Sequence, residues 1–243
     1  YPVSEIEALN SKDCKCSKDM ENPVVFDGPI APLNEEVSVH IRGPLNLLKF
    51  GWYHSESYKF GNTDGNWTRG AFYDALEATA ENVTFLGNVG FENVCLGQAL
   101  IHVDETGISK ANDSTILGNV TIPSNYELTI MSDLECSGKE CGAFRPDSEA
   151  YHGFYGTNKM FLFEFNAPSD LREEDNVNKT WNYDMPAIWL LNAQIPRTSQ
   201  YPLNPNCSAW NSGAGEFDIF EVMNVTERNH FFSTLHDFQG TDD

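Results

Sequence analysis

Three carboxylates lie close together in the apolar run 213–223: Glu216, Asp218 and Glu221. Residues two apart in a β-strand share a face, so a strand over this run would point Glu216 and Asp218 the same way. A β-bulge at Ile219 or Phe220 would return Glu221 to that acidic face, and bulges are common beside active sites. The spacing therefore predicts three carboxylates on one face of a bulged strand.

Such a set suits glycoside hydrolysis, in which one carboxylate is the nucleophile and another, kept protonated, is the general acid. Four pleat steps separate the Cα atoms of Glu216 and Glu221 by about 13 Å. Leaning side chains can close this towards the ~5–5.5 Å of a retaining enzyme. Asp218 between them can modulate both pKa values. We expect burial to raise the pKa of Glu221 while Glu216 stays ionised.

The alternative is a solvated polar face on an amphipathic strand. Like charges side by side on a sheet repel each other. No Lys or Arg occurs between Arg197 and Arg228 to neutralise them. A purely structural origin therefore explains one such carboxylate better than three.

Three stretches resemble glycoside hydrolase family sixteen, the laminarinase and β-glucanase jelly rolls. Residues 216–221 resemble its E-x-D-x-x-E signature, and 185–191 resemble its W-P-A-I-W-L-L strand with Met in the first position. Residues 234–236 resemble its T-x-H strand. The resemblance implies Glu216 as nucleophile, Asp218 as its helper and Glu221 as general acid/base.

The same resemblance makes His236 an accessory cleft residue, although a strand-end structural histidine is the alternative. Trp189 and Trp210 are candidate sugar platforms, because an aromatic ring stacks on the apolar face of a pyranose. Trp189 lies in an apolar run and fits the core equally well. Trp210, in a turn rich in Gly, Ser and Asn, is the better platform.

Other stretches resemble the fungal-type cell-wall Tos protein family, of which the glucanase-like segment is the C-terminal part: 41–45, 82–86, 150–154 and 192–198. This resemblance implies a secreted wall protein that acts on β-1,3-glucan. The alternatives are a non-catalytic, lectin-like carbohydrate-binding protein and a structural wall component. A lectin has no need of all three carboxylates, whereas an enzyme needs both glutamates.

The elements that must position these residues are short runs of β-branched and aromatic residues between Gly, Asn, Asp and Pro. They predict an all-β fold, a concanavalin-like β-sandwich (jelly roll). Alanines favour one short helix over 72–81. We expect a Cys-containing N-terminal extension over 1–35, a β region over 36–122 and a glucanase-like jelly-roll segment over 123–243.

The 243 residues are long enough for a sizeable core, and the 40% hydrophobic and 12% aromatic fractions exclude a disordered acidic chain. The 15 basic and 36 acidic residues give a net charge of −21, which disfavours nucleic-acid and anionic-membrane partners. No apolar run approaches the roughly 20 residues of a membrane helix.

Two features predict a secreted glycoprotein. The Asn-x-Ser/Thr sequons lie at Asn66, Asn82, Asn112, Asn119, Asn178, Asn206 and Asn224. The even cysteine set predicts three disulfides of open connectivity among Cys14, Cys16, Cys95, Cys136, Cys141 and Cys207. Their spacing does not fit a zinc site. We expect no cofactor, although jelly rolls of the glucanase class often carry a structural calcium.

In family sixteen the signature strand lies near the middle of the domain, but here it lies close to Asp243. We therefore expect further strands to come from a second polypeptide, produced by cleavage near 240–243, or from residues beyond this sequence. Permutation of the N-terminal part into those positions is the alternative. An uncovered sheet edge would favour aggregation.

Overall fold

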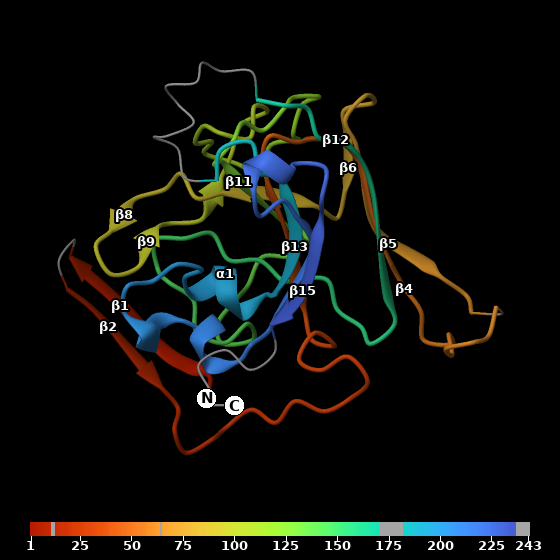
Figure 1. Cartoon of the computed structure of the whole chain (residues 1–243). Helices are drawn as coiled ribbons and strands as arrows, with labels where there is room; N and C mark the ends of the chain where they lie inside the picture. The colour runs from red at the N-terminus through yellow and green to blue at the C-terminus, as the bar shows by residue number, and fades with distance from the viewer. Residues whose placement is uncertain (11–12, 64, 171–181, 237–243) are drawn as a thin grey trace.

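The computed structural model describes residues 1–243 except 11–12, 64, 171–181 and 237–243 (Figure 1). Two antiparallel sheets face each other. The seven-stranded sheet has the order β10 (Ile101–His102), β7 (Thr84–Gly87), β11 (Glu127–Met131), β3 (Val37–Arg42), β13 (Ala187–Asn192), β14 (Glu216–Glu221), β15 (Phe232–His236). The four-stranded sheet has the order β12 (Lys159–Asn166), β4 (Asn46–His54), β5 (Thr68–Asp74), β6 (Thr79–Glu81). The prediction of an all-β sandwich is confirmed.

The main core lies between the two sheets. Strand β3 buries Val37, Val39 and Ile41 there, packed with apolar residues of β4, β5, β11 and β13. Side chains alternate along a strand, so the intervening polar residues of β3 point to the opposite face. That outer face of the seven-stranded sheet carries the candidate site.

Helical structure is confined to short segments in the described part of the chain: α1 (Gln194–Thr198) and the 3₁₀ turns η2 (Pro205–Cys207), η3 (Trp210–Ser212) and η4 (Val225–Glu227). None of the described helices has the length and apolar character needed to span a bilayer.

Strands from the two halves of the sequence share the larger sheet. β3 lies between β11 and β13, and β15 forms one edge. The N-terminal strands thus enter the sheet on the other side of β13, and no described strand pairs with the outer side of β15. A second polypeptide beside β15 stays a prediction.

The predicted helix over 72–81 is wrong. The segment forms strands β5 and β6, joined by a tight turn. The carboxylate of Asp74 accepts hydrogen bonds from the backbone N–H groups of Leu76 and Glu77, and Ala78 has a positive φ of 49°. Side-chain bonding to the backbone by Asp favours such turns over helices, which outweighs the helical preference of alanine.

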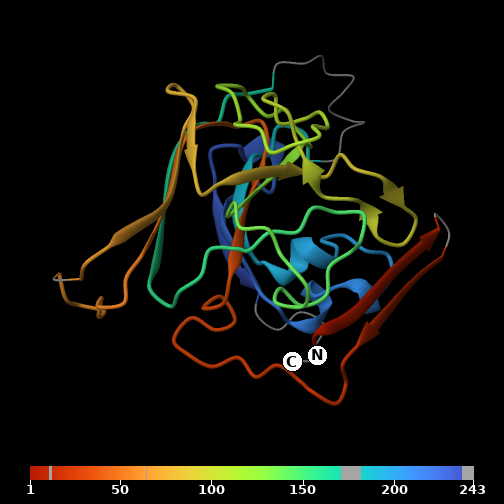
Figure 2. The same ribbon diagram turned by 180° about the vertical axis from the view of Figure 1, so that it is seen from behind.

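The N-terminal extension forms a hairpin of β1 (Val3–Asn10) and β2 (Asp13–Lys18), which lies near the β8 (Glu92–Asn93) and β9 (Gly97–Gln98) hairpin in both views (Figures 1 and 2). Disulfides join Cys14 to Cys95 and Cys16 to Cys207, and a third joins Cys136 to Cys141. The predicted three disulfides are confirmed. Two of them fasten the hairpin to loops that reach the candidate site.

The sequon asparagines of the described residues are all exposed: Asn66, Asn82, Asn112, Asn119, Asn206 and Asn224. Asn178 lies outside the described residues. An exposed position is required for an attached glycan, and glycosylation itself stays a prediction.

Candidate active site

The bulge predicted in the acidic strand is present. In the pairing of β13 with β14, Ile188 lies opposite Phe220 and Trp189 lies opposite Asp218, which leaves Ile219 as the extra residue. A bulge shifts the face of every residue that follows it. It therefore places Glu221 on the same face as Glu216 and Asp218.

The three carboxylates line one cavity of about 210 Å³ on the outer face of the larger sheet. Trp189 and His236 border the same cavity, and Trp210 borders an adjoining cavity of about 280 Å³ together with Glu216. The structure thus brings together every catalytic and substrate-binding candidate from the sequence: Glu216, Asp218, Glu221, Trp189, Trp210 and His236.

Glu216 is the carboxyl with the clearest perturbation. Burial, and then the charge of Asp218, raise the pKa of Glu216 to about 7. The indole N–H of Trp210 donates a 2.7 Å hydrogen bond to Oε2 of Glu216, which opposes that rise. This raised pKa contradicts the expectation that Glu216 stays ionised, because burial and the adjacent acid both disfavour its charged form.

The other two carboxylates each have a basic partner. Nε2 of His236 lies 3.1 Å from Oδ2 of Asp218, although burial, and then the charge of Glu221, still raise the pKa of Asp218. Nη2 of Arg42 forms an ion pair of 2.9 Å with Oε1 of Glu221. The pairing strands bring these partners to the site from β15 and β3.

Trp189 forms the floor of the site and is only 4% exposed. Its ring stacks on His40 with 5.3 Å between ring centroids, so one of its faces is covered. Burial lowers the pKa of His40 to about 3, which keeps this histidine neutral. His40 is held in place by Ser38 at 2.8 Å and Thr129 at 3.2 Å. The indole N–H of Trp189 has no hydrogen-bond partner among the described residues.

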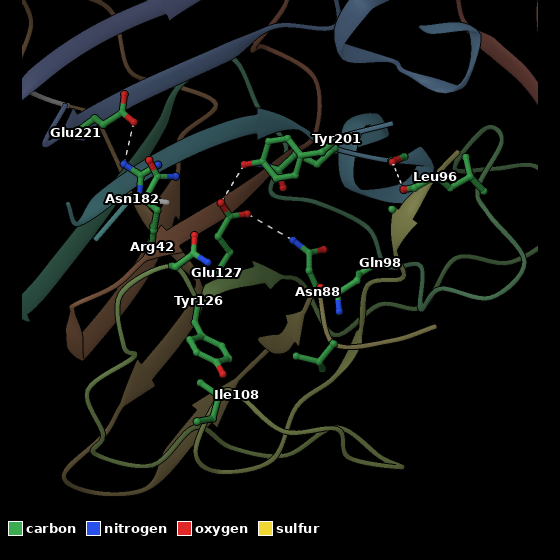
Figure 3. A pocket seen from close by; sticks show the side chains of 15 residues that line it. Arg42, Asn88, Leu96, Gln98, Ile108, Tyr126, Glu127, Asn182, Tyr201 and Glu221 are labelled. Carbon is green, nitrogen blue, oxygen red and sulfur yellow. Dashed lines mark hydrogen bonds and ion pairs between the residues drawn. The ribbon is translucent and has the colours of Figure 1, made fainter. Parts of the chain in front are cut away.

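A larger cavity of about 940 Å³ continues from the acidic site across β3 and β11 (Figure 3). Arg42, Tyr201 and Glu221 border both cavities. Glu127 of β11 also lines the larger cavity, and it is the direct cross-strand neighbour of Arg42. The sequence reasoning missed Arg42, Glu127 and Tyr201. Once the pairing of β3 with β11 is known, period-two alternation shows which face of the sheet carries the side chains of Arg42 and Glu127.

Within the described residues, two groups of potential metal ligands occur: one of Cys14, Cys16 and Cys207, and one of Cys136, Cys141 and His152. Every cysteine in them is part of a disulfide, so neither group offers a thiolate. The catalytic candidates form no such group.

Two family models cover nearly the whole chain. The model described as "Cell wall protein YJL171C/Tos1, N-terminal" matches residues 3–55, and "Cell wall protein YJL171C/Tos1, C-terminal" matches residues 65–243. No solved structure gives a significant match.

Curated relatives carry one common description. The chain is 51% identical, over 99% of its length, to "Probable circularly permuted 1,3-beta-glucanase PGA52" of Candida albicans, of which the match covers 63%. It is 46% identical, over 98% of its length, to "Probable circularly permuted 1,3-beta-glucanase YJL171C" of Saccharomyces cerevisiae, of which the match covers 61%. The chain thus spans about three fifths of the length of these relatives. By these matches, the chain belongs to the YJL171C/Tos1 family of cell wall proteins.

Proposed function

We propose that this chain carries the acidic site of a retaining β-1,3-glucanase or transglycosylase of the cell wall, with a catalytic sheet of the family-sixteen type. The observation that carries the proposal is the gathering of Glu216, Asp218 and Glu221 in one cavity on a bulged strand. The printed names of the relatives support the substrate class, because they describe 1,3-beta-glucanases. Their words "circularly permuted" agree with the insertion of β3 between β11 and β13.

In the first step, the carboxylate of Glu216 attacks the anomeric carbon, and the bond to the leaving oxygen breaks as Glu221 donates a proton to that oxygen. The neighbouring acids and burial make Glu216 a more basic carboxylate, which favours bonding to a carbon that develops positive charge. The Trp210 N–H orients its Oε2 atom.

In the second step, Glu221 removes a proton from water, or from a sugar hydroxyl, which attacks the same carbon and releases Glu216. Two displacements restore the original anomeric configuration.

Arg42 pairs with Glu221 in the free site and also lines the larger cavity. A bound sugar that accepts hydrogen bonds from Arg42 competes with Glu221 for this partner.

Asp218 lies between the two glutamates, and its charge raises the pKa of Glu216. His236 positions the carboxylate of Asp218 through the contact between Nε2 and Oδ2. Trp189 forms the floor of the cavity beneath the carboxylates. The disulfides and the exposed sequons support a secreted, extracellular location in the wall.

The proposal is tested by product analysis. The chain should release oligosaccharides from laminarin, and early products should keep the β configuration in proton NMR. Glu216→Gln and Glu221→Gln should each abolish turnover with unchanged circular dichroism. Glu164→Gln, whose side chain is 61% exposed on the opposite sheet, is the matched control. Turnover that survives Glu216→Gln, or inversion of configuration, would overturn the proposal. Elongated oligosaccharides among the products would identify transfer rather than hydrolysis.

A further inference from the structure

Tyr201 occupies an unusual place beside the acidic site. It lies on the loop between α1 and η2 and borders all three neighbouring cavities, of about 940, 280 and 210 Å³. The residue is 62% exposed, although the loop around it is well anchored. A large ring that stays exposed at the junction of three cavities presents an apolar face to whatever fills them.

The hydroxyl of this ring is fixed by a carboxyl group. Tyr201 donates a 3.0 Å hydrogen bond to Oε1 of Glu127, and Nδ2 of Asn88 donates a 3.4 Å hydrogen bond to its Oε2 (Figure 3). Burial raises the pKa of Glu127, and the bond from Tyr201 opposes that rise. Glu127 belongs to a central strand, so it ties the loop ring to the rigid sheet.

The backbone on both sides of Tyr201 is anchored as well. Ser199 Oγ donates to the carbonyl of Leu96 at 2.6 Å, and the Leu203 N–H donates to the carbonyl of Cys95 at 3.0 Å. Cys95 is itself linked to the N-terminal hairpin by a disulfide. A ring held in this way loses little conformational entropy when a ligand stacks on it, which favours affinity.

The lining of the large cavity indicates the ligand class. It carries neutral amide side chains that can both donate and accept hydrogen bonds: Asn88, Gln98, Asn125, Asn182 and Gln200. An anionic ligand would meet Glu127 and Glu221 there, with Arg42 as the basic residue of the lining. Amide groups around an exposed aromatic face suit a neutral polyhydroxy ring.

From this geometry we infer that Tyr201 is a stacking platform for a neutral pyranoside unit bound next to the carboxylates, and that Glu127 is the positioning residue that holds the platform. The inference rests on the proposed function for the identity of the sugar chain. It adds a binding subsite that selects neutral over acidic polysaccharides.

The test measures binding without turnover. In the Glu216→Gln background, isothermal titration with laminarihexaose should show about tenfold weaker binding for Tyr201→Ala, because the stacking contact is lost. Tyr201→Phe keeps the ring and should lose much less. Phe60→Ala, which removes a fully exposed aromatic side chain elsewhere (100% exposed), is the control and should change nothing. Unchanged affinity in Tyr201→Ala would overturn the platform.

The role of Glu127 is tested by a conservative pair. Glu127→Gln keeps an acceptor for the Tyr201 hydroxyl and should retain near-parental affinity, whereas Glu127→Ala should weaken laminarihexaose binding. Equal losses in both variants, at equal thermal stability, would overturn the positioning role.

In the enzyme with Glu216 intact, Tyr201→Ala should raise KM and leave kcat within about twofold. Because the titrations need no turnover, binding that depends on Tyr201 in a chain without glucanase activity would refute the proposed function while supporting the subsite.

Discussion

The indole N–H of Trp210 donates its hydrogen bond to the most perturbed carboxyl of the site, Oε2 of Glu216, at 2.7 Å. The relationship joins the 3₁₀ turn η3 to the first residue of β14. Trp210 also borders the cavity of about 280 Å³, so it both orients an acid and is a candidate wall for a sugar.

Trp210→Phe keeps a ring but removes this donor. Hydrogen bonds to charged groups contribute about 1.5–3 kcal/mol, so kcat/KM on laminarin should fall by about 10- to 100-fold. Because the lost bond lowers the pKa of Glu216, that pKa should rise in the variant. Trp67→Phe, at a ring that packs on Tyr58, is the control and should be neutral. A Trp210→Phe enzyme with parental kcat/KM would contradict the orienting role.

The pH dependence of the reaction follows from Glu216. A nucleophile must be ionised, and the pKa of Glu216 is raised to about 7, so kcat/KM should increase with pH through this value. Asp218 raises the pKa of Glu216, so Asp218→Asn should move this limb to lower pH. Asp133→Asn, at an exposed loop position, should leave the limb in place. A limb that stays in place in Asp218→Asn would contradict its assignment to Glu216.

Glu36 makes a separate contribution to folding stability. Burial opposes its charge, but bonds from His152 and Arg197 outweigh this and hold the pKa of Glu36 below its ordinary 4.5. A lowered folded-state pKa gives stability that is present above 4.5 and is lost as pH falls through the folded value. Glu36→Gln leaves the buried Arg197 uncompensated and should lower the free energy of unfolding by about 3 kcal/mol at pH 7.

The difference between the Glu36→Gln variant and the parent should shrink as pH falls below 4.5, since the unfolded parent takes up a proton there while the folded parent does so only at its lower pKa. Urea denaturation at pH 7 and pH 3 measures this. The same loss of stability at both pH values would show that the ion pairs are not its origin.

The Cys16–Cys207 disulfide should support both stability and the site. It spans 191 positions, whereas Cys136–Cys141 spans 5. A longer closed loop restricts the unfolded chain more, so Cys16→Ser/Cys207→Ser should cost at least about 2 kcal/mol and Cys136→Ser/Cys141→Ser less. The Cys16–Cys207 disulfide also anchors the segment that precedes η3. The Cys16→Ser/Cys207→Ser variant should therefore have a higher KM for laminarin. Equal effects of the two pairs in thermal unfolding and in KM would contradict this account.

The acidic row could be predicted from sequence because its information is local. Period-two alternation and one inserted residue are enough to place Glu216, Asp218 and Glu221 on one face. The same count leaves the bulge at Ile219 or Phe220, and the strand pairing places it at Ile219. Local reasoning failed at 72–81, because the side chain of Asp74 closes a turn where alanines favour a helix.

The electrostatics of the site could not be predicted in this way. The Arg42 partner of Glu221 lies 179 positions away in sequence and reaches it only through the register of β3, β13 and β14. Glu127 and Tyr201 meet for a similar reason, across 74 positions. Which carboxyl gains a raised pKa therefore depends on strand order, which no local pattern contains.

Covalent trapping determines whether Glu216 is the nucleophile of a double displacement on β-1,3-glucan. A 2-deoxy-2-fluoro laminaribiosyl fluoride should form a stable glycosyl-enzyme, because the fluorine at C2 slows both displacements, whereas the anomeric fluoride is a good leaving group that keeps the first displacement fast enough for the intermediate to accumulate. Peptide mass spectrometry of the trapped protein should place the disaccharide on Glu216 in the parent and give no adduct in Glu216→Gln. An adduct on Glu221, or no adduct while laminarin is still being cleaved, would contradict the account.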